Sequence, residues 1–215
     1  MKILIINPNS DESTAEVLRK TASTFLQGRI QADVVSMKTA PPLVVTYEDQ
    51  AACVKELAAT IRACREEYDA FILACHADPN LDLARELAAG KPVFGIAEAS
   101  IHMAAMTSGG YAVLTPSEKI IPKKFALARK YHCENQLKTV VVSKGNDPDS
   151  LLAAAKEARK VPNVGAIVLG CANYSGADGY LEAALGVPVF DGLIWALILA
   201  EGTVRSRSYQ QQTQS

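Results

Sequence analysis

Long apolar runs are missing from this sequence, and none approaches the roughly 20 residues that a membrane-spanning helix needs. Neither sign of charge is in excess, because 22 basic and 23 acidic residues give a formal net charge of −1. Binding to nucleic acid or to an anionic membrane requires a basic excess, so we expect neither partner. The apolar start ends at Asn7-Pro8-Asn9, too early for a signal peptide, and we therefore expect a cytoplasmic protein.

The cysteine pattern lacks the features of a cross-linked or metal-bound fold. There is no Cys-x-x-Cys pair, and the number of cysteines is odd. The sequence therefore predicts neither a disulfide framework nor a metal site. Each thiol is then either a small buried group or a reactive one. The five are Cys53, Cys64, Cys75, Cys133 and Cys171.

Short apolar runs alternate with helical patterns along most of the chain, and a hydrophobic content of 49% is typical of a folded protein. The expected strands are Lys2–Asn7, Ala32–Met37, Ala70–Ala74, Val93–Ile96, Tyr111–Leu114, Thr139–Val142, Ala166–Leu169 and Val187–Phe190. The expected helices are Asp11–Leu26, Tyr47–Glu67, Pro79–Ala89, Ile101–Thr107, Pro122–Lys130, Asp149–Arg159, Ala177–Leu185 and Leu193–Val204. This alternation predicts an α/β fold with mostly parallel sheets covered by helices on both faces.

An internal duplication divides the chain. Cys75 aligns with Cys171 and Pro92 with Pro188, 96 positions apart in both cases, and each cysteine follows a strand-like apolar run. We therefore predict two pseudo-symmetric α/β lobes, with the active site in the cleft between them. The expected lobes are 1–97 plus 191–204 and 98–190, and the polar tail 205–215 is expected to be disordered.

The duplicated position places one cysteine just past the carboxyl end of a strand in each lobe, where α/β proteins bind their ligands. Helices are expected to begin shortly after Cys75 and Cys171, with Asp78 as the N-cap in the first lobe. A thiol near a helix N-terminus is expected to have a lowered pKa. A thiolate and a thiol on opposite sides of a carbon form an acid/base pair that inverts that carbon.

The enolate formed in such a reaction needs hydrogen-bond donors at its oxygen. Backbone N–H groups of the two turns are suitable, as are the side chains of Asn7, Asn9, Ser10, Thr115 and Ser117. His76 is either a cation that favours the thiolate at Cys75 or a polar residue of the turn. A lone cysteine is usually an inert buried residue, and we interpret the other three cysteines in this way.

Several motifs occur in a fixed order: Asn7-Pro8-Asn9-Ser10, Cys75 followed by Asp78-Pro79, Gly95-Ile96-Ala97-Glu98-Ala99, Gly170-Cys171-Ala172, and Pro188-Val189-Phe190-Asp191-Gly192. Together they resemble the aspartate/glutamate/hydantoin racemase superfamily, and within it the hydantoin and allantoin racemase branch. The resemblance covers nearly the whole chain up to residue 201. It implies racemisation without a cofactor by Cys75 and Cys171, and substrate contacts from the Asn-Pro-Asn-Ser loop.

The sequence differs from the branch in residues that are expected to line the pocket. His76 stands where the branch usually has an aromatic residue, and Ala172-Asn173-Tyr174 follows the second cysteine where Ala-Gly-Met is usual. Thr115-Pro116 replaces a pair of threonines. These polar changes leave the substrate open among hydantoins, allantoin and amino acids.

We therefore expect an isomerase that acts on a small molecule and, as is common in the family, forms a homo-oligomer. Three alternatives stay open. The resemblance extends to a maleate cis–trans isomerase and to an arylmalonate decarboxylase, although the latter keeps only one of the two cysteines. A binding protein without catalytic activity could also use this scaffold.

Overall fold

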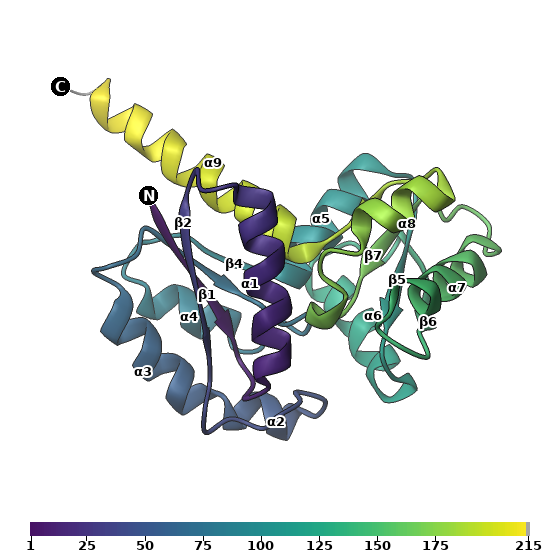
Figure 1. Ribbon diagram of the computed structural model, residues 1–215, viewed down its shortest axis with the longest axis horizontal. Helices are drawn as coiled ribbons and strands as arrows, with labels where there is room; N and C mark the ends of the chain where they lie inside the picture. Colours follow the sequence, from purple (N-terminus) through teal and green to yellow (C-terminus); the bar gives the residue numbers. More distant parts are fainter. Residues whose placement is uncertain (214–215) are drawn as a thin grey trace.

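The computed structural model describes residues 1–213 and contains two four-stranded parallel sheets (Figure 1). The first sheet has the strand order β2-β1-β3-β4, and the second has the order β6-β5-β7-β8. Their strands are β1 Lys2–Asn7, β2 Gln31–Ser36, β3 Ala70–Leu73, β4 Val93–Gly95, β5 Tyr111–Thr115, β6 Leu137–Val142, β7 Ala166–Leu169 and β8 Val189–Phe190. The predicted α/β class with two helix-covered parallel sheets is confirmed.

Helices connect consecutive strands and cover both faces of each sheet (Figure 1). They are α1 Glu12–Leu26, α2 Tyr47–Ala52, α3 Val54–Cys64, α4 Leu81–Leu87, α5 Ile96–Thr107, α6 Ile121–Lys130, α7 Pro148–Arg159, α8 Asp178–Leu185 and α9 Gly192–Gln212, with 3₁₀ turns η1 Glu118–Ile120 and η2 Ala172–Tyr174. Several helices begin at a residue whose side chain accepts a hydrogen bond from a backbone N–H of the first turn: Asp11 caps α1 in this way, and Asp147 caps α7. Among the described residues, no helix is both long enough and apolar enough to cross a membrane.

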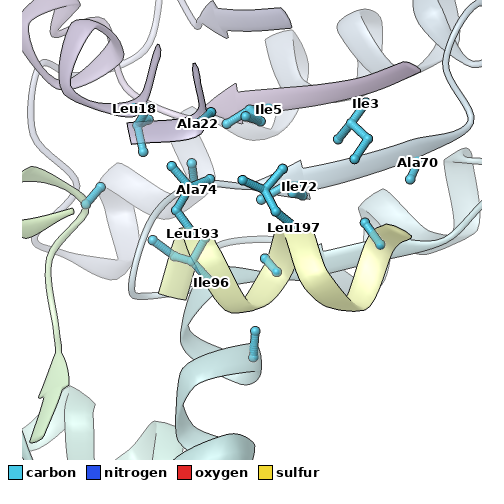
Figure 2. Close-up of a cluster of buried hydrophobic side chains, with 14 of the residues drawn as sticks. Ile3, Ile5, Leu18, Ala22, Ala70, Ile72, Ala74, Ile96, Leu193 and Leu197 are labelled. Carbon is cyan, nitrogen blue, oxygen red and sulfur yellow. The ribbon is translucent and has the colours of Figure 1, made fainter. Parts of the chain in front are cut away.

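The core of the first lobe lies on both faces of its sheet. On one face, α1 and α9 pack on β1 and β3, as the side chains in Figure 2 show. Leu18 of α1 and Leu193 and Leu197 of α9 are fully buried there. Complete burial of a leucine side chain contributes about 1.5–3 kcal/mol, so these contacts hold the helices firmly on the sheet.

Helices α5 and α9 pack against each other and join the two lobes. Helix α5 follows β4 of the first sheet, yet Ala97, Ile101 and Ala104 belong to the core of the second lobe. Helix α9 follows β8 of the second sheet and packs in the core of the first lobe. Each lobe therefore sends its last helix into the neighbouring lobe, and this exchange fixes the two sheets relative to each other.

Several boundaries differ from the sequence prediction. The predicted helix 47–67 is divided at Cys53 into α2 and α3, and α5 begins five residues earlier than predicted, directly after β4. The prediction of a disordered tail from residue 205 was wrong as far as residue 212, because α9 continues to Gln212. Positions 214 and 215 lie outside the described residues. The division into 1–97 plus 191–204 and 98–190 stays a prediction.

Candidate active site

The two duplicated cysteines line one cavity at the carboxyl ends of the strands. Cys75 lies two positions after β3 and Cys171 two positions after β7. The cavity has a volume of about 60 Å³. Of the residues predicted from the sequence, it is lined by Asn9, Cys75, His76, Cys171, Ala172 and Asn173. The two cysteines therefore line a shared space rather than separate apolar interiors.

Each cysteine turn has a backbone N–H group in the same position relative to its sulfur atom. The N–H of Ala77 donates a hydrogen bond to the sulfur of Cys75, and the N–H of Asn173 donates one to the sulfur of Cys171. In both turns the donor is the second residue after the cysteine. A hydrogen bond to a thiolate favours the charged form, so each turn is built to accept a negative charge on its sulfur.

Burial nevertheless raises the pKa of both thiols, which corrects the expectation of lowered values. Loss of hydration raises the pKa of Cys75 to about 12, although the Ala77 N–H and the charge of Lys124 oppose that rise. The pKa of Cys171 is raised for the same reason, against the Asn173 N–H and Lys124. The expected helix effect is small because α4 begins only at Leu81, and Cys171 precedes a 3₁₀ turn.

A lysine that the sequence analysis missed joins the two turns. Lys124 of α6 is 4% exposed. Its ammonium donates to the carbonyl of His76, to the carbonyl of Gly170 at 2.8 Å and to Nδ1 of His76 at 3.0 Å. Loss of hydration lowers the pKa of Lys124 to about 8, while the two thiols and Asp78 act to raise it. Lys124 therefore brings a positive charge to the buried end of the cavity.

His76 is a neutral, buried link in this network. Because Nδ1 accepts from Lys124, Nε2 carries the proton and donates to Oγ of Ser100 at 3.2 Å. Ser100 in turn donates to the carbonyl of Ile96 at 2.8 Å. Burial and the charge of Lys124 hold the pKa of His76 well below its usual value. Of the two roles left open for His76, these bonds favour the polar residue of the turn over the cation, and Lys124 supplies the positive charge there.

Asp78 caps a different helix from the one predicted. Its carboxylate accepts from the backbone N–H groups of Ala97 and Glu98 at 3.1 and 2.7 Å, and from the hydroxyl of Tyr131 at 2.6 Å. It therefore caps α5, whereas the N-cap of α4 is Asn80. Burial raises the pKa of Asp78 to about 6 against these three donors.

Of the Asn-Pro-Asn-Ser loop, Asn9 lines the cavity, and Asn7 supports the loop from behind through hydrogen bonds. Asn7 is fully buried, and its amide donates to Oδ1 of Asn9 at 2.7 Å and to the carbonyl of Asp11 at 3.1 Å. Asn9 lines the cavity. The backbone of Ser10 donates to the carbonyl of Pro41 at 3.2 Å, and neither Asn7 nor Ser10 lines the cavity.

The remaining predicted residues, Thr115, Ser117 and Tyr174, do not line the small cavity. Thr115 is fully buried at the end of β5 and does not line the cavity. Ser117 and Tyr174 line a wider neighbouring cavity of about 700 Å³, which Cys171 and Asn173 also line. The site is therefore continuous with a larger space on the Cys171 side.

Most apolar wall residues were missed by the sequence analysis. Leu43, Val44 and Ile120 line the small cavity, together with Thr14 and with Pro116, which was expected to line the pocket. They come from the segment after β2, the segment after β5 and helix α1, and they share no motif. Only the position of two of these segments, directly after the carboxyl end of a strand, gave a signal for them.

The other three cysteines lie outside this cavity, as expected for inert thiols. Cys53 is fully buried and its thiol donates to the carbonyl of Pro8 at 2.9 Å, while burial raises its pKa to about 11. Cys133 is buried and Cys64 half-buried. Within residues 1–213, no three His, Cys, Asp or Glu side chains are grouped to hold a metal ion.

Comparison with known proteins places this geometry in a wider group. A family model described as Asp/Glu/Hydantoin racemase matches residues 3–200. Hydantoin racemase of Pseudomonas sp. (strain NS671) is 32% identical over 215 aligned residues, which cover 95% of this chain and 86% of that protein. Allantoin racemase from Klebsiella pneumoniae is 28% identical with a TM-score of 0.89, and the superposition covers 95% of this chain and 88% of that protein. The maleate isomerase Iso from Pseudomonas putida S16 shares the fold: it is 20% identical, with a TM-score of 0.70, over 94% of this chain and 93% of its own.

Proposed function

Because the chain belongs to the Asp/Glu/hydantoin racemase family and is an isomerase of the racemase type, we propose that Cys75 and Cys171 are its catalytic acid and base. The two thiols transfer a proton at a carbon next to a carbonyl group, without a cofactor. The observation that supports this proposal is the shared cavity, in which each sulfur receives a backbone N–H from its own turn.

In the proposed reaction, the thiolate of one cysteine removes the proton from the substrate carbon, and the C–H electron pair moves into the carbonyl to form an enolate. The thiol of the other cysteine returns a proton to the opposite face, and the electron pair moves back to the carbon. The configuration is inverted, and the second cysteine becomes the thiolate. Proton transfer by a placed side chain contributes about 10²–10⁴-fold to the rate.

The substrate that we propose is a 5-substituted hydantoin or allantoin, with free amino acids as the other class to be tested. This choice follows relatives that are named hydantoin racemase and allantoin racemase. Both substrates are small rings with a carbonyl beside an acidic carbon. Asn9 and Asn173 line the cavity, and we propose that their amides donate to the ring carbonyls and that the space lined by Tyr174 takes the substituent. Cytoplasmic location and assembly into a homo-oligomer stay predictions.

The experiment follows single enantiomers of 5-substituted hydantoins, allantoin, aspartate and glutamate by chiral chromatography, with and without EDTA. Racemisation above the rate in buffer alone is expected for a ring substrate and should not depend on EDTA. Cys75→Ser and Cys171→Ser should each lower kcat by about 10³-fold. Cys64→Ser is the control, because this half-buried thiol does not line the cavity.

Full activity in either serine variant at the cavity would contradict the two-base mechanism. Maleate is included in the same series, because the maleate isomerase has the same fold. Formation of fumarate without racemisation of any ring or amino acid would assign the cysteines to cis–trans isomerisation instead.

A further inference from the structure

We propose that Lys124 is a positioning residue that clamps the two cysteine turns together and provides one positive charge that acts on both cysteine sulfurs. This inference rests on the proposed two-cysteine function and deepens it. It assigns a role to a buried charge that the racemase geometry alone does not require.

The clamp is visible in the acceptors of Lys124. The carbonyl of His76 directly follows Cys75 in the chain, and the carbonyl of Gly170 directly precedes Cys171. One ammonium group bonds to both carbonyls, so a single atom connects the cysteine turn of the first lobe to that of the second. The lysine itself comes from α6, a third element. Any movement of one turn relative to the other must break one of these bonds.

Lys124 has no donor left for a substrate. An ammonium group has three protons, and the acceptors are the two carbonyls and Nδ1 of His76. His76 is itself held by Ser100 of α5, whose hydroxyl also donates to the carbonyl of Ile96 in the same helix, so the imidazole is fixed in place. Lys124 therefore acts on the reaction through its electric field and through the placement of the turns. Its removal should affect kcat more than KM.

The field acts on both sulfur atoms. The charge of Lys124 lowers the pKa of Cys75 and that of Cys171 against the larger effect of burial. The ionisable groups that act on Lys124 are these two thiols and Asp78, and His76 beside it is neutral. One buried cation can balance one thiolate. When either cysteine loses its proton during the reaction, the same ammonium group is its counter-ion, so the negative charge can pass from one sulfur to the other without a change of counter-ion.

The test compares Lys124→Met with Lys130→Met, which removes a positive charge from the exposed end of the same helix. Alkylation of each cysteine by iodoacetamide is measured by peptide mass spectrometry from pH 7 upward. Near pH 7, Lys124 of the unaltered protein still holds most of its proton, because its pKa is lowered only to about 8, and it loses that proton above pH 8. Removal of this cation raises the thiol pKa values by at least about one unit, so both cysteines of Lys124→Met should react at least about tenfold more slowly near pH 7. This difference should shrink above pH 8, where Lys124 of the unaltered protein is neutral.

The pH dependence of this rate ratio separates the charge from changes of access or packing. Altered access to the cavity changes the alkylation rate by the same factor at all pH values, whereas the effect of the charge fades as Lys124 of the unaltered protein loses its proton. Lys130→Met should leave the rates at both cysteines unchanged. Lys124→Arg, which keeps the charge, should slow them less near pH 7 than Lys124→Met. Equal rates in Lys124→Met and the unaltered protein would overturn the proposal, as would a ratio that does not change with pH or an effect at only one of the two cysteines.

A measurement on the intact lysine covers the case in which Lys124→Met does not fold. The ¹⁵Nζ signal of Lys124 should shift in both Cys75→Ser and Cys171→Ser, whereas the signal of Lys130 should stay in place. No shift in either variant contradicts the shared charge. If alkylation responds to Lys124 but neither serine variant loses racemisation, the proposed function fails while the charge coupling stands; the reverse result removes only the role of Lys124.

Discussion

The turn that carries Cys75 and the turn that carries Cys171 have matching backbones but different side chains. Each begins where a strand ends, and each cysteine receives an N–H from the second residue after it. The residues just before the cysteines also match, since the N–H of Ala74 donates to Ile6 and that of Gly170 donates to Leu114, both at 2.8 Å. The duplicated part of the site is thus the main chain, which supplies the donors that a thiolate needs on either side.

The capping carboxylates show how the side chains have been redistributed. In the second copy of the repeat, Asp191 stands at the start of α9 and accepts from the N–H of Leu193 at 2.9 Å. In the first copy the aligned position is Gly95, and the carboxylate that caps α5 comes from Asp78. The position aligned with Asp78 is Tyr174. Both copies of the repeat therefore place a carboxylate at the same kind of helix start, but they supply it from opposite ends of the repeat.

The strongest test of this comparison asks whether the two cysteines serve opposite faces of the substrate. Cys75→Ala and Cys171→Ala should each lower racemisation by about 10³-fold or more. Each variant keeps one thiol, so it should still exchange the substrate hydrogen for deuterium from one enantiomer, and the two variants should prefer opposite enantiomers. Exchange is followed by mass spectrometry in deuterated water with single enantiomers.

The same preferred enantiomer in both variants would show that the cysteines do not face each other across the carbon. In the unaltered enzyme, kcat/KM must be equal for two enantiomers that differ at a single stereocentre, because their equilibrium constant is one. Unequal surroundings of the two sulfurs are therefore expected to appear in kcat and KM separately, and in the exchange of the single variants.

A second test asks whether Gly95 is needed to make room for the capping carboxylate of Asp78. A Cβ atom on Gly95 would lie 2.3 Å from Cγ of Asp78, so Gly95→Ala should lower the free energy of unfolding by about 2–3 kcal/mol. The same change in an Asp78→Ala background should cost less than about 1 kcal/mol, because the clash is gone. Urea unfolding of the four proteins gives the coupling energy. Gly109→Ala, where a Cβ would meet nothing within 4 Å, is the control; equal costs in both backgrounds would contradict the geometry.

The sequence allowed the elements around the site to be predicted because their signals are local. Apolar runs such as Lys2–Asn7 and Ala166–Leu169 coincide with β1 and β7. The cysteine pair was found through the internal repeat, which needs no knowledge of distances. The start of α5 was missed because its capping side chain, Asp78, lies far away in the sequence while Gly95 offers no side chain of its own.

Lys124 was missed for a related reason. It interrupts the apolar stripe of α6, where Leu127 and Ala128 are buried. A lysine in such a stripe usually extends its charge to solvent along an apolar stem, and only tertiary structure shows that this one ends on buried carbonyls. The same limit explains His76, whose pKa is lowered by burial and by the charge of Lys124, neither of which its neighbours in the sequence reveal.

The smallest predicted effect compares the hydroxyl groups that support the two capping carboxylates. Tyr131 donates to Asp78 at 2.6 Å, and Ser175 donates to Asp191 at 2.7 and 2.9 Å. Tyr131→Phe and Ser175→Ala should each lower the free energy of unfolding by about 1–2 kcal/mol near pH 8, which lies above the pKa of Asp78. Urea unfolding measures this cost, with Tyr180→Phe as an exposed control that should change little.

The pH dependence of that cost gives the sharper comparison. The Tyr131 hydroxyl acts to lower the pKa of Asp78, which burial raises to about 6. The bond therefore stabilises the charged carboxylate, and Tyr131→Phe should cost least below about pH 4.5, where Asp78 is protonated, and most above pH 6. The pKa of Asp191 is also raised by burial and lowered by its serine partner, so Ser175→Ala should follow the same direction. If the loss of stability depended on pH for only one of the two variants, the two carboxylates would not be equivalent caps.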